Sequence, residues 1–200
     1  HNTWCCLAFY PGLDDPELLY GNLFATSKGL SEQGLGFKNN EANAGNLYHK
    51  TLLKYQDVLL AIAKGLNHRK PVYLLGEVFG PVQDLTYGLV NPEFRVFDIY
   101  VGEPGQGRFY NYDELVAESE ISGFELVPVA YYGPYSKEAE LSVRDGKTLF
   151  DAVDQIREGV VIKPVKERTH PTLGRVQLKS VSPDYLLRKG KKGKEVTEFQ

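Results

Sequence analysis

The stretch Glu-Gly-Val-Val-Ile-Lys at residues 158–163 is the most informative part of the sequence, together with Val-Gln-Leu-Lys-Ser at residues 176–180. Each predicts a short β-strand in which charged residues accompany an apolar run. Strands usually hide Val and Ile and leave charge outside. Charged residues at both ends of a buried apolar run, here Glu158 and Lys163, indicate a strand that positions these side chains at a functional site. An edge strand with solvated ends is the alternative that this stretch alone leaves open.

The rest of the sequence predicts an α+β fold built on antiparallel sheets. Leu52, Tyr55, Leu59, Ile62 and Leu66 recur every three or four positions, which is the spacing of an amphipathic helix. Runs bounded by Gly, Pro and Asn predict strands at residues 3–9, 22–27, 72–79, 94–101 and 126–130, helices at 113–120 and 148–157, and a long loop at 29–46. Many strands with few long helices favour the α+β class.

The composition excludes several classes of protein. A chain of 200 residues with 42% hydrophobic and 24% charged residues is ordinary for a globular domain. Its apolar runs fall well short of a bilayer span. Cys5 and Cys6 are the only cysteines, so we expect buried free thiols in a reducing cytoplasm rather than a disulfide framework or a zinc site. His49, His68 and His170 lack the spacing of metal ligands.

The formal net charge of −3 conceals a basic segment near the C-terminal end. Without Arg188, Lys189, Lys191, Lys192 and Lys194 the chain would carry −8. This basic tail is either a solvated, frayed end or a contact to the phosphate backbone of a nucleic acid, whose hallmark is strong salt dependence.

Three further segments complete an ordered set of motifs. They are Leu-Gly-Glu-Val-Phe-Gly-Pro-Val-Gln at residues 75–83, Arg-Val-Phe-Asp-Ile-Tyr-Val at 95–101 and His-Asn-Thr-Trp-Cys at 1–5. Taken in order, the five segments resemble the nucleotidyltransferase motifs of ATP-dependent RNA ligases that form a covalent lysyl-adenylate. The resemblance extends from His1 to about Lys189, and five matches in order are far more specific than one.

The resemblance implies a fold and an activity. The fold is a nucleotidyltransferase (ATP-grasp-like ligase) domain, α+β, of two antiparallel sheets around a nucleotide pocket, over residues 1–189 and followed by the tail 190–200. The activity joins RNA 5′-phosphate and 3′-hydroxyl ends through enzyme-AMP and RNA-adenylate intermediates. Phosphoryl transfer needs positioned charge, so ATP and Mg²⁺ (or Mn²⁺) are the implied cofactors. We expect a cytoplasmic monomer that uses RNA as its partner and no membrane.

The nucleophile of similar enzymes lies in a Lys-x-His-Gly pattern. His1 matches the histidine, Asn2 occupies the glycine position, and Thr3 and Trp4 follow as in relatives. Asn tolerates positive φ better than most residues, so it is an acceptable replacement. The nucleophilic lysine would then lie two residues before His1. We expect it in a preceding segment, and the alternative is a domain without a nucleophile.

Residues in the first half of the chain acquire nucleotide-binding roles from the resemblance. Glu77 would hold the ribose hydroxyls, and Phe97 would stack on the adenine unless it only packs in the core. Lys28 matches a basic residue near the AMP phosphate, with an ordinary surface lysine as the alternative. Asp98 lies beside Phe97 but on the other side of a regular strand, so a structural role and a catalytic role both remain open for it.

The two opening segments acquire phosphate and metal roles. Glu158 matches the glutamate that organises the metal and the lysine, and Lys179 matches a lysine that contacts phosphate. Gln177 stands where relatives often carry a second lysine, on the same strand face as Lys179, so phosphate neutralisation is weakened or shifts to Lys28. Lys163 belongs to the Glu158 motif but lies on the opposite face of a regular strand, where it contacts nucleotide or serves structure.

Three functions remain open at this point. An ATP-dependent RNA ligase working in RNA repair is favoured, because His1 is followed by Thr3 and Trp4 as in that family. A DNA ligase or an mRNA-capping guanylyltransferase shares the fold and most motifs. A catalytically dead relative that binds RNA ends or nucleotide is the third reading.

Overall fold

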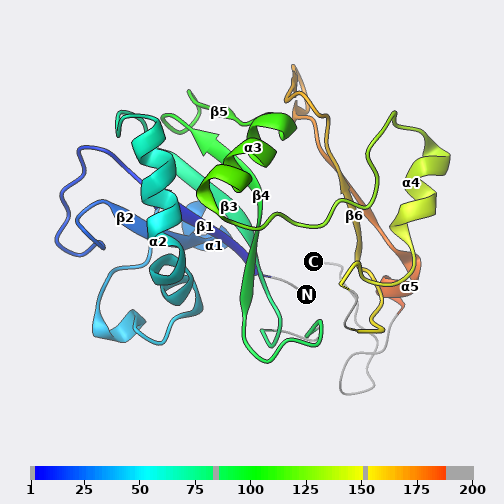
Figure 1. Ribbon diagram of the computed structural model, residues 1–200, viewed down its shortest axis with the longest axis horizontal. Helices are drawn as coiled ribbons and strands as arrows, with labels where there is room; N and C mark the ends of the chain where they lie inside the picture. Colours follow the sequence, from blue (N-terminus) through cyan, green and yellow to red (C-terminus); the bar gives the residue numbers. More distant parts are fainter. Residues whose placement is uncertain (1–2, 83–85, 151–152, 188–200) are drawn as a thin grey trace. The chain divides into compact units, whose positions relative to one another are not determined.

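The computed structural model describes residues 3–82, 86–150 and 153–187, and the chain divides into two compact units (Figure 1). The sheet unit consists of Thr3–Val78 and Phe94–Val127. The ladder unit consists of Phe79–Glu93 and the described residues from Pro128 onward.

A five-stranded sheet forms the centre of the sheet unit, in the order β2-β1-β3-β4-β5. Its strands are β1 (Thr3–Phe9), β2 (Leu23–Ser27), β3 (Val72–Phe79), β4 (Glu93–Val101) and β5 (Arg108–Phe109). β1 pairs antiparallel with β2 on one side and with β3 on the other. The Gly102 N–H donates to the Pro71 carbonyl at 2.9 Å, so β4 ends beside the start of β3, as in an antiparallel pair.

Helix α2 (Leu47–Gly65) covers one face of this sheet, as Figure 1 shows in cyan. It begins where the Asn46 side chain accepts hydrogen bonds from the N–H groups of the first turn. Its apolar stripe buries Leu52, Leu59 and Ile62, each at most 1% exposed. The ring of Tyr55 meets Phe94 of β4 edge-on at 5.2 Å between centroids. The main core therefore lies between α2 and the sheet.

Shorter helices complete the sheet unit. They are α1 (Lys28–Ser31), the 3₁₀ turn η1 (Glu41–Asn43) and α3 (Tyr112–Ser122). At the start of α3 the Glu114 carboxylate accepts from the Asn111 N–H at 2.8 Å. The helix ends at Gly123, whose φ of 72° is a left-handed conformation that glycine adopts without strain.

The ladder unit contains two short antiparallel strand pairs. β6 (Gly159–Ile162) pairs with β9 (Leu178–Val181), and β7 (Thr169–His170) pairs with β8 (Gly174–Arg175). Helix α4 (Lys137–Arg144) packs on β6 and β9, and α5 (Pro183–Leu186) follows β9. A ring cluster of Phe79, Tyr87 and Phe150, with centroids 5.0–5.6 Å apart, supplies apolar packing elsewhere in this unit.

Most predicted elements of the sheet unit are confirmed. The strands predicted at 3–9 and 72–79 coincide with β1 and β3, and those at 22–27 and 94–101 differ from β2 and β4 by one residue. The helix predicted at 52–66 is α2, which starts five residues earlier, and the loop at 29–46 contains α1 and η1. Antiparallel sheets are confirmed, and the described residues place them in one five-stranded sheet and two two-stranded ladders.

Two predicted elements are wrong. The described residues between 148 and 157 are not helical: the Thr148 N–H donates to the Gln155 carbonyl at 2.7 Å, so the chain turns back on itself. The Arg157 guanidinium bonds the carbonyls of Val143 and Lys147, which holds this turn against the end of α4. The strand predicted at 126–130 is reduced to a parallel bridge between Leu126 and Val96.

The cysteines behave as expected, because Cys5 and Cys6 are free and buried. Burial raises the pKa of the Cys6 thiol to about 12, so this thiol stays protonated at neutral pH. Within the described ranges, no helix has both the length and the apolar character that a bilayer crossing needs.

Candidate nucleotidyltransferase site

The start of β1 lies between the ends of its two partner strands. Trp4 pairs with Glu77 of β3, and Cys5 pairs with Ser27, the last residue of β2. Lys28 follows Ser27 directly, is exposed, and opens α1. Residues directly opposite in an antiparallel pair have Cβ atoms about 5 Å apart. The register thus places Lys28 on one side and Glu77 on the other side of the start of β1, which follows the Lys-x-His-Gly-like motif. His1 itself lies outside the described residues.

Glu77 and Phe97 occupy the same face of the sheet. A Cβ at Gly76 would touch the Phe94 ring, and Phe94 contacts α2, so Gly76 and Phe94 share the face that α2 covers. Glu77 is one residue from Gly76, and Phe97 is three from Phe94, so strand alternation puts both on the other face. Both side chains are half-buried. The structure therefore gathers the predicted ribose and adenine contacts on one surface.

A β-bulge interrupts β4 between Val96 and Ile99. Val96 bonds outward to residues 125 and 127, and the Ile99 carbonyl bonds outward to Tyr110. In a regular strand, residues whose backbone groups point to the same edge are two or four positions apart, whereas Val96 and Ile99 are three positions apart. The extra residue is a bulge, a feature that re-aims side chains near functional sites. Asp98 is only 2% exposed, and its structural and catalytic roles both stay predictions.

In the ladder unit, Glu158 and Lys179 form an ion pair. The Lys179 ammonium nitrogen lies 2.6 Å from Glu158 Oε1, with side chains 58% and 24% exposed. Glu158 directly precedes β6, where its carbonyl accepts from the Ser182 N–H, and Lys179 lies in β9, where it pairs with Val161. The two charges that the sequence assigned to separate motifs are therefore direct partners.

Gly159 explains how Glu158 reaches Lys179. In a regular strand Glu158 would point to the same side as Val160, whereas Lys179 shares the side of Val161. Gly159 has φ +146°, a conformation that other residues rarely adopt, and a Cβ there would overlap the Ser180 carbonyl. The alternation is broken at this glycine, and the carboxylate turns toward the lysine. A glycine directly after Glu158 therefore suits this geometry.

Lys163 and Gln177 border these strands without belonging to them. Lys163 follows the last residue of β6 and is half-buried, and Gln177 precedes the first residue of β9 and is exposed. The prediction that Glu158 and Lys163 lie on opposite faces was based on a regular strand. The backbone at Gly159 is not that of a regular strand, so the prediction no longer follows. Their roles remain predictions.

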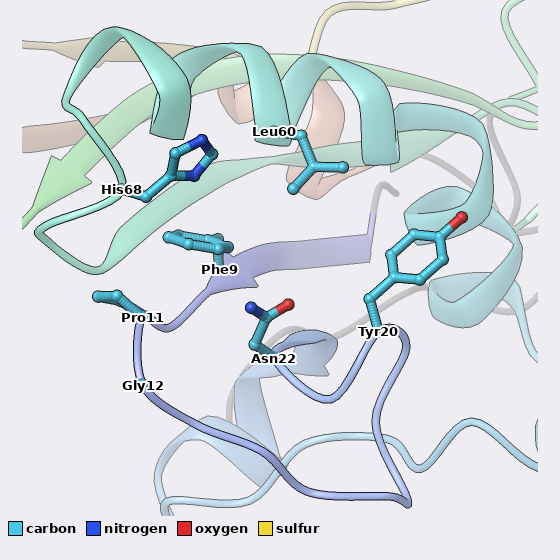
Figure 2. Close-up of a pocket in the computed structure, with 7 residues that line it drawn as sticks. All are labelled: Phe9, Pro11, Gly12, Tyr20, Asn22, Leu60 and His68. Atoms are coloured by element: carbon cyan, nitrogen blue, oxygen red, sulfur yellow. The ribbon is translucent and has the colours of Figure 1, made fainter.

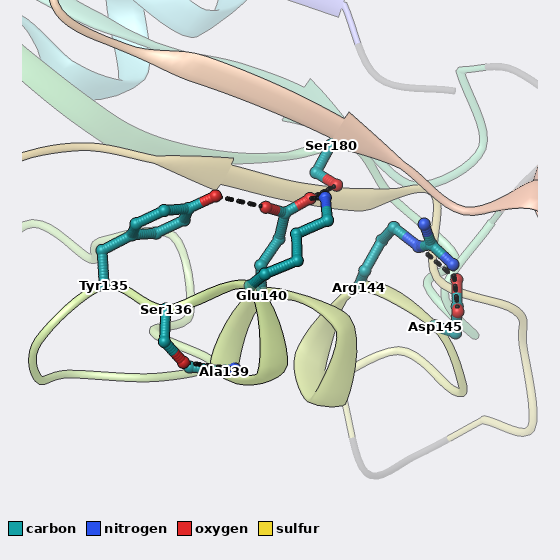
Figure 3. A network of polar contacts seen from close by, with 8 residues as sticks. Tyr135, Ser136, Ala139, Glu140, Arg144, Asp145 and Ser180 are labelled. Carbon is teal, nitrogen blue, oxygen red and sulfur yellow. Dashed lines mark hydrogen bonds and ion pairs between the residues drawn. The ribbon is translucent and has the colours of Figure 1, made fainter.

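Glu140 of α4, which the sequence reading missed, fixes β9 from the other side (Figure 3). Its carboxylate accepts from Ser180 Oγ at 2.7 Å, from Lys137 Nζ at 2.7 Å and from the Tyr135 hydroxyl at 2.8 Å. These three donors lower the pKa of Glu140 from 4.5 to about 2. Because Ser180 follows Lys179 in β9, its bond to α4 leaves Lys179 pointing to the opposite side. A cue to α4 was present in Ser136, which caps the helix by accepting from the Ala139 N–H.

Comparison with known proteins identifies the family. The family model described as RNA ligase matches residues 10–181 of the chain. The chain belongs to the RNA ligase family.

Solved RNA ligase structures from Naegleria gruberi share the fold. A variant solved with ATP and Mn is 18% identical to this RNA ligase family member, with a TM-score of 0.63, and the match covers 92% of this chain and 48% of that one. The same ligase solved with PPi gives 18% identity, a TM-score of 0.62 and the same coverage. The chain thus spans about half the length of these structures. No curated protein matches it.

The residues of this RNA ligase family member suit a metal bound largely through phosphates. The described residues contain no group of three or more His, Cys, Asp or Glu side chains that could hold a metal ion. Mg²⁺ commonly uses one or two carboxylates together with substrate phosphates and water, so a prebuilt cluster is not required. Glu158 is a part-exposed carboxylate that fits this description.

We expect Gly159→Ala to destabilise the ladder unit by about 1–3 kcal/mol, because the added Cβ combines a strained φ with overlap against β9. Urea denaturation measures the loss. Gly174→Ala is the matched control, since Gly174 also has positive φ (+76°) but nothing lies within 4 Å of its added Cβ. An equal loss in both variants would show that the close approach to Ser180 is unimportant.

We expect Glu140→Gln to lower the melting temperature at neutral pH and to abolish a pH dependence that the wild type shows. Because folding lowers the pKa of Glu140, its contribution is complete above pH 4.5 and disappears as the pH falls toward 2. The melting curves of variant and wild type should therefore converge over that interval. A constant difference down to pH 2 would contradict the role of the carboxylate, and Glu120→Gln, at an exposed position of α3, is the control.

Proposed function

We propose that this chain is the adenylyltransferase part of an ATP-dependent RNA ligase that joins RNA ends in repair. Family membership supplies the reaction class, and the Glu158–Lys179 pair is the observation that carries the proposal. An ion pair exposed on one face of a two-stranded ladder adds little to stability. Its dependence on a backbone conformation that only glycine adopts readily, at Gly159, therefore points to chemistry.

The proposed reaction has three phosphoryl transfers. The amine of a lysine two residues before His1 attacks the α-phosphorus of ATP, so that an N–P bond forms and the bond to the β-phosphate oxygen breaks, releasing pyrophosphate. An RNA 5′-phosphate oxygen then attacks the same phosphorus and displaces the lysine. Finally an RNA 3′-hydroxyl attacks the 5′-phosphorus, which seals the strand and releases AMP.

The ladder unit would supply charge for these steps. Lys179 would neutralise the α-phosphate, since stabilisation of charge on the transferring group is the main demand of phosphoryl transfer. Glu158 would orient the Lys179 ammonium and hold Mg²⁺ or Mn²⁺, which neutralises the departing pyrophosphate. Gln177 leaves this strand one cation short of the usual pattern, and Lys163 or Lys28 would compensate.

The sheet unit would supply nucleotide recognition. Phe97 would stack on adenine, and the Glu77 carboxylate would accept hydrogen bonds from the ribose hydroxyls. Their common sheet face supports these roles. Lys28, beside the start of β1, would approach the phosphates of the same nucleotide.

Other parts of the proposal concern the whole enzyme. The basic tail, Arg188 to Lys194, lies outside the described residues, and its proposed contact with RNA phosphates stays a prediction. We also propose a monomer in the cytoplasm. A DNA ligase would differ in the strand that it seals, which the sealing assay below detects, and a capping guanylyltransferase would differ from a dead relative in taking covalent label from GTP.

We expect Glu158→Ala and Lys179→Ala each to reduce sealing of nicked RNA by on the order of 10²–10³, the usual cost of losing charge stabilisation in the transition state. Folding should be nearly unchanged, because Lys179 is largely exposed, Glu158 is part-exposed, and ion pairs at the surface add little stability. A protein that includes the residues before His1 is assayed with ATP and Mg²⁺, alongside thermal melts.

The matched control is Lys166→Ala, which removes an exposed lysine of the same unit outside both strands. Near wild-type sealing by either test variant, with an unchanged melting temperature, would overturn its assignment. Sealing of nicked DNA but not RNA would favour the DNA ligase, and no sealing by the wild type would favour the capping guanylyltransferase or the dead relative.

A further inference from the structure

Two hollows open at the end of the sheet opposite to Glu77. The loop of residues 66–71, between α2 and β3, contributes to both. His68 lines a hollow of about 550 Å³, whereas Arg69 and Lys70 line one of about 480 Å³. Phe9 pairs with Val72 here, and β1 runs seven residues from Thr3 to this point, a length on the order of 20 Å. These hollows are therefore distinct from the proposed nucleotide contacts.

The first hollow is lined by rings and one amide (Figure 2). His68 meets the Phe9 ring edge-on at 5.6 Å, and Tyr20 is 68% exposed on the far side. Asn22 lies between them, and its Oδ1 is buried without a hydrogen-bond partner among the described residues. Flat rings beside an amide offer stacking and hydrogen bonding at once, which suits a nucleobase.

Backbone strain is concentrated at this hollow. Tyr20 and His68 have φ of 52° and 51°, and Asn67 beside His68 has 54°. Positive φ is uncommon outside glycine and costs about 1–3 kcal/mol where surrounding structure enforces it. Two of the ring-bearing residues of one hollow are therefore held in costly conformations, a pattern associated with ligand sites.

Three cations, Arg69, Lys70 and Arg108, outnumber one carboxylate, Glu103, in the lining of the second hollow. Within the described part of the chain, neither Arg69 nor Lys70 is paired with a carboxylate. Arg108, also in its lining, is held by Glu114 through two bonds of 2.6 and 2.7 Å and lies 5.3 Å from the Tyr110 ring. Unpaired cations in a recess are the usual contacts for phosphate groups.

We propose that these two hollows bind a single-stranded segment of the RNA substrate, with a base stacked in the first and phosphates held by Arg69 and Lys70 in the second. This rests on the proposed function, which makes RNA the substrate. Bases on rings and phosphates on cations are a combination that tolerates any sequence. The surface would hold RNA away from the reacting ends and so lengthen the footprint of the enzyme.

The test measures affinity for a fluorescent single-stranded oligouridylate across a salt series. Arg69→Gln/Lys70→Gln should flatten the logarithmic salt slope by about 1.4, since each lost phosphate contact on a single strand removes about 0.7. Tyr20→Ala should weaken binding roughly 5- to 150-fold at low salt with the slope unchanged, because loss of stacking costs about 1–3 kcal/mol per base. The charge-matched control Lys50→Gln/Lys54→Gln, on α2, should leave slope and affinity near wild type.

Covalent AMP labelling of the same variants separates this proposal from the proposed function, because the first transfer needs no RNA. Wild-type labelling in Arg69→Gln/Lys70→Gln with a flattened slope supports the RNA surface. Wild-type labelling with a slope and affinity equal to wild type in both test variants overturns it. Failure of the wild type itself to label would instead contradict the proposed function.

Discussion

The double pairing of β1 is the constraint on which the sheet unit depends. Because β1 has a partner on each side, its register decides where the ends of β2 and β3 fall relative to Trp4. A shift of one residue along the β1–β3 ladder would reverse the faces of β3, moving Glu77 into the core and Leu74 out of it. Burial of Leu7 and Leu74 against α2, both fully enclosed, resists such a shift. Core packing and site geometry are thus set by the same hydrogen bonds.

In the ladder unit, a local departure from regular strand geometry, rather than the strand register, places the candidate site residues. Two strands of four residues each would present Glu158 and Lys179 to opposite sides if alternation held. The backbone of Gly159 breaks it, and Glu140 anchors the neighbouring Ser180 to α4. Because the pKa of Glu140 is lowered to about 2, its carboxylate stays ionised in moderately acidic solution as well as at neutral pH, so the anchor persists. The Glu158–Lys179 pair is therefore oriented by the backbone at Gly159 and by the Glu140–Ser180 hydrogen bond.

Periodicity predicted the regular parts of this fold well. The apolar spacing of α2 and the alternation in β1 and β3 are local signals, so these elements could be read directly. The helix predicted at 148–157 was wrong because this segment packs in a ring cluster and forms a turn that Arg157 stabilises. Both depend on contacts with residues outside the segment, which a local pattern does not contain. Glu158 and Lys179 were found through ordered motifs, but their pairing required the ladder register and the φ of Gly159. Glu140 and the hollows beside His68 depend on contacts distant in sequence, and their residues carry no motif.

The proposed function places the covalent AMP on a lysine two residues before His1. The most direct measurement is to incubate a protein that carries those residues with α-labelled ATP or GTP and Mg²⁺, digest it, and locate the label by mass spectrometry. We predict that ATP labels the lysine two residues before His1, in the peptide that leads into β1, and that GTP gives no label. Label from GTP alone, label on another residue, or no covalent label would contradict the account.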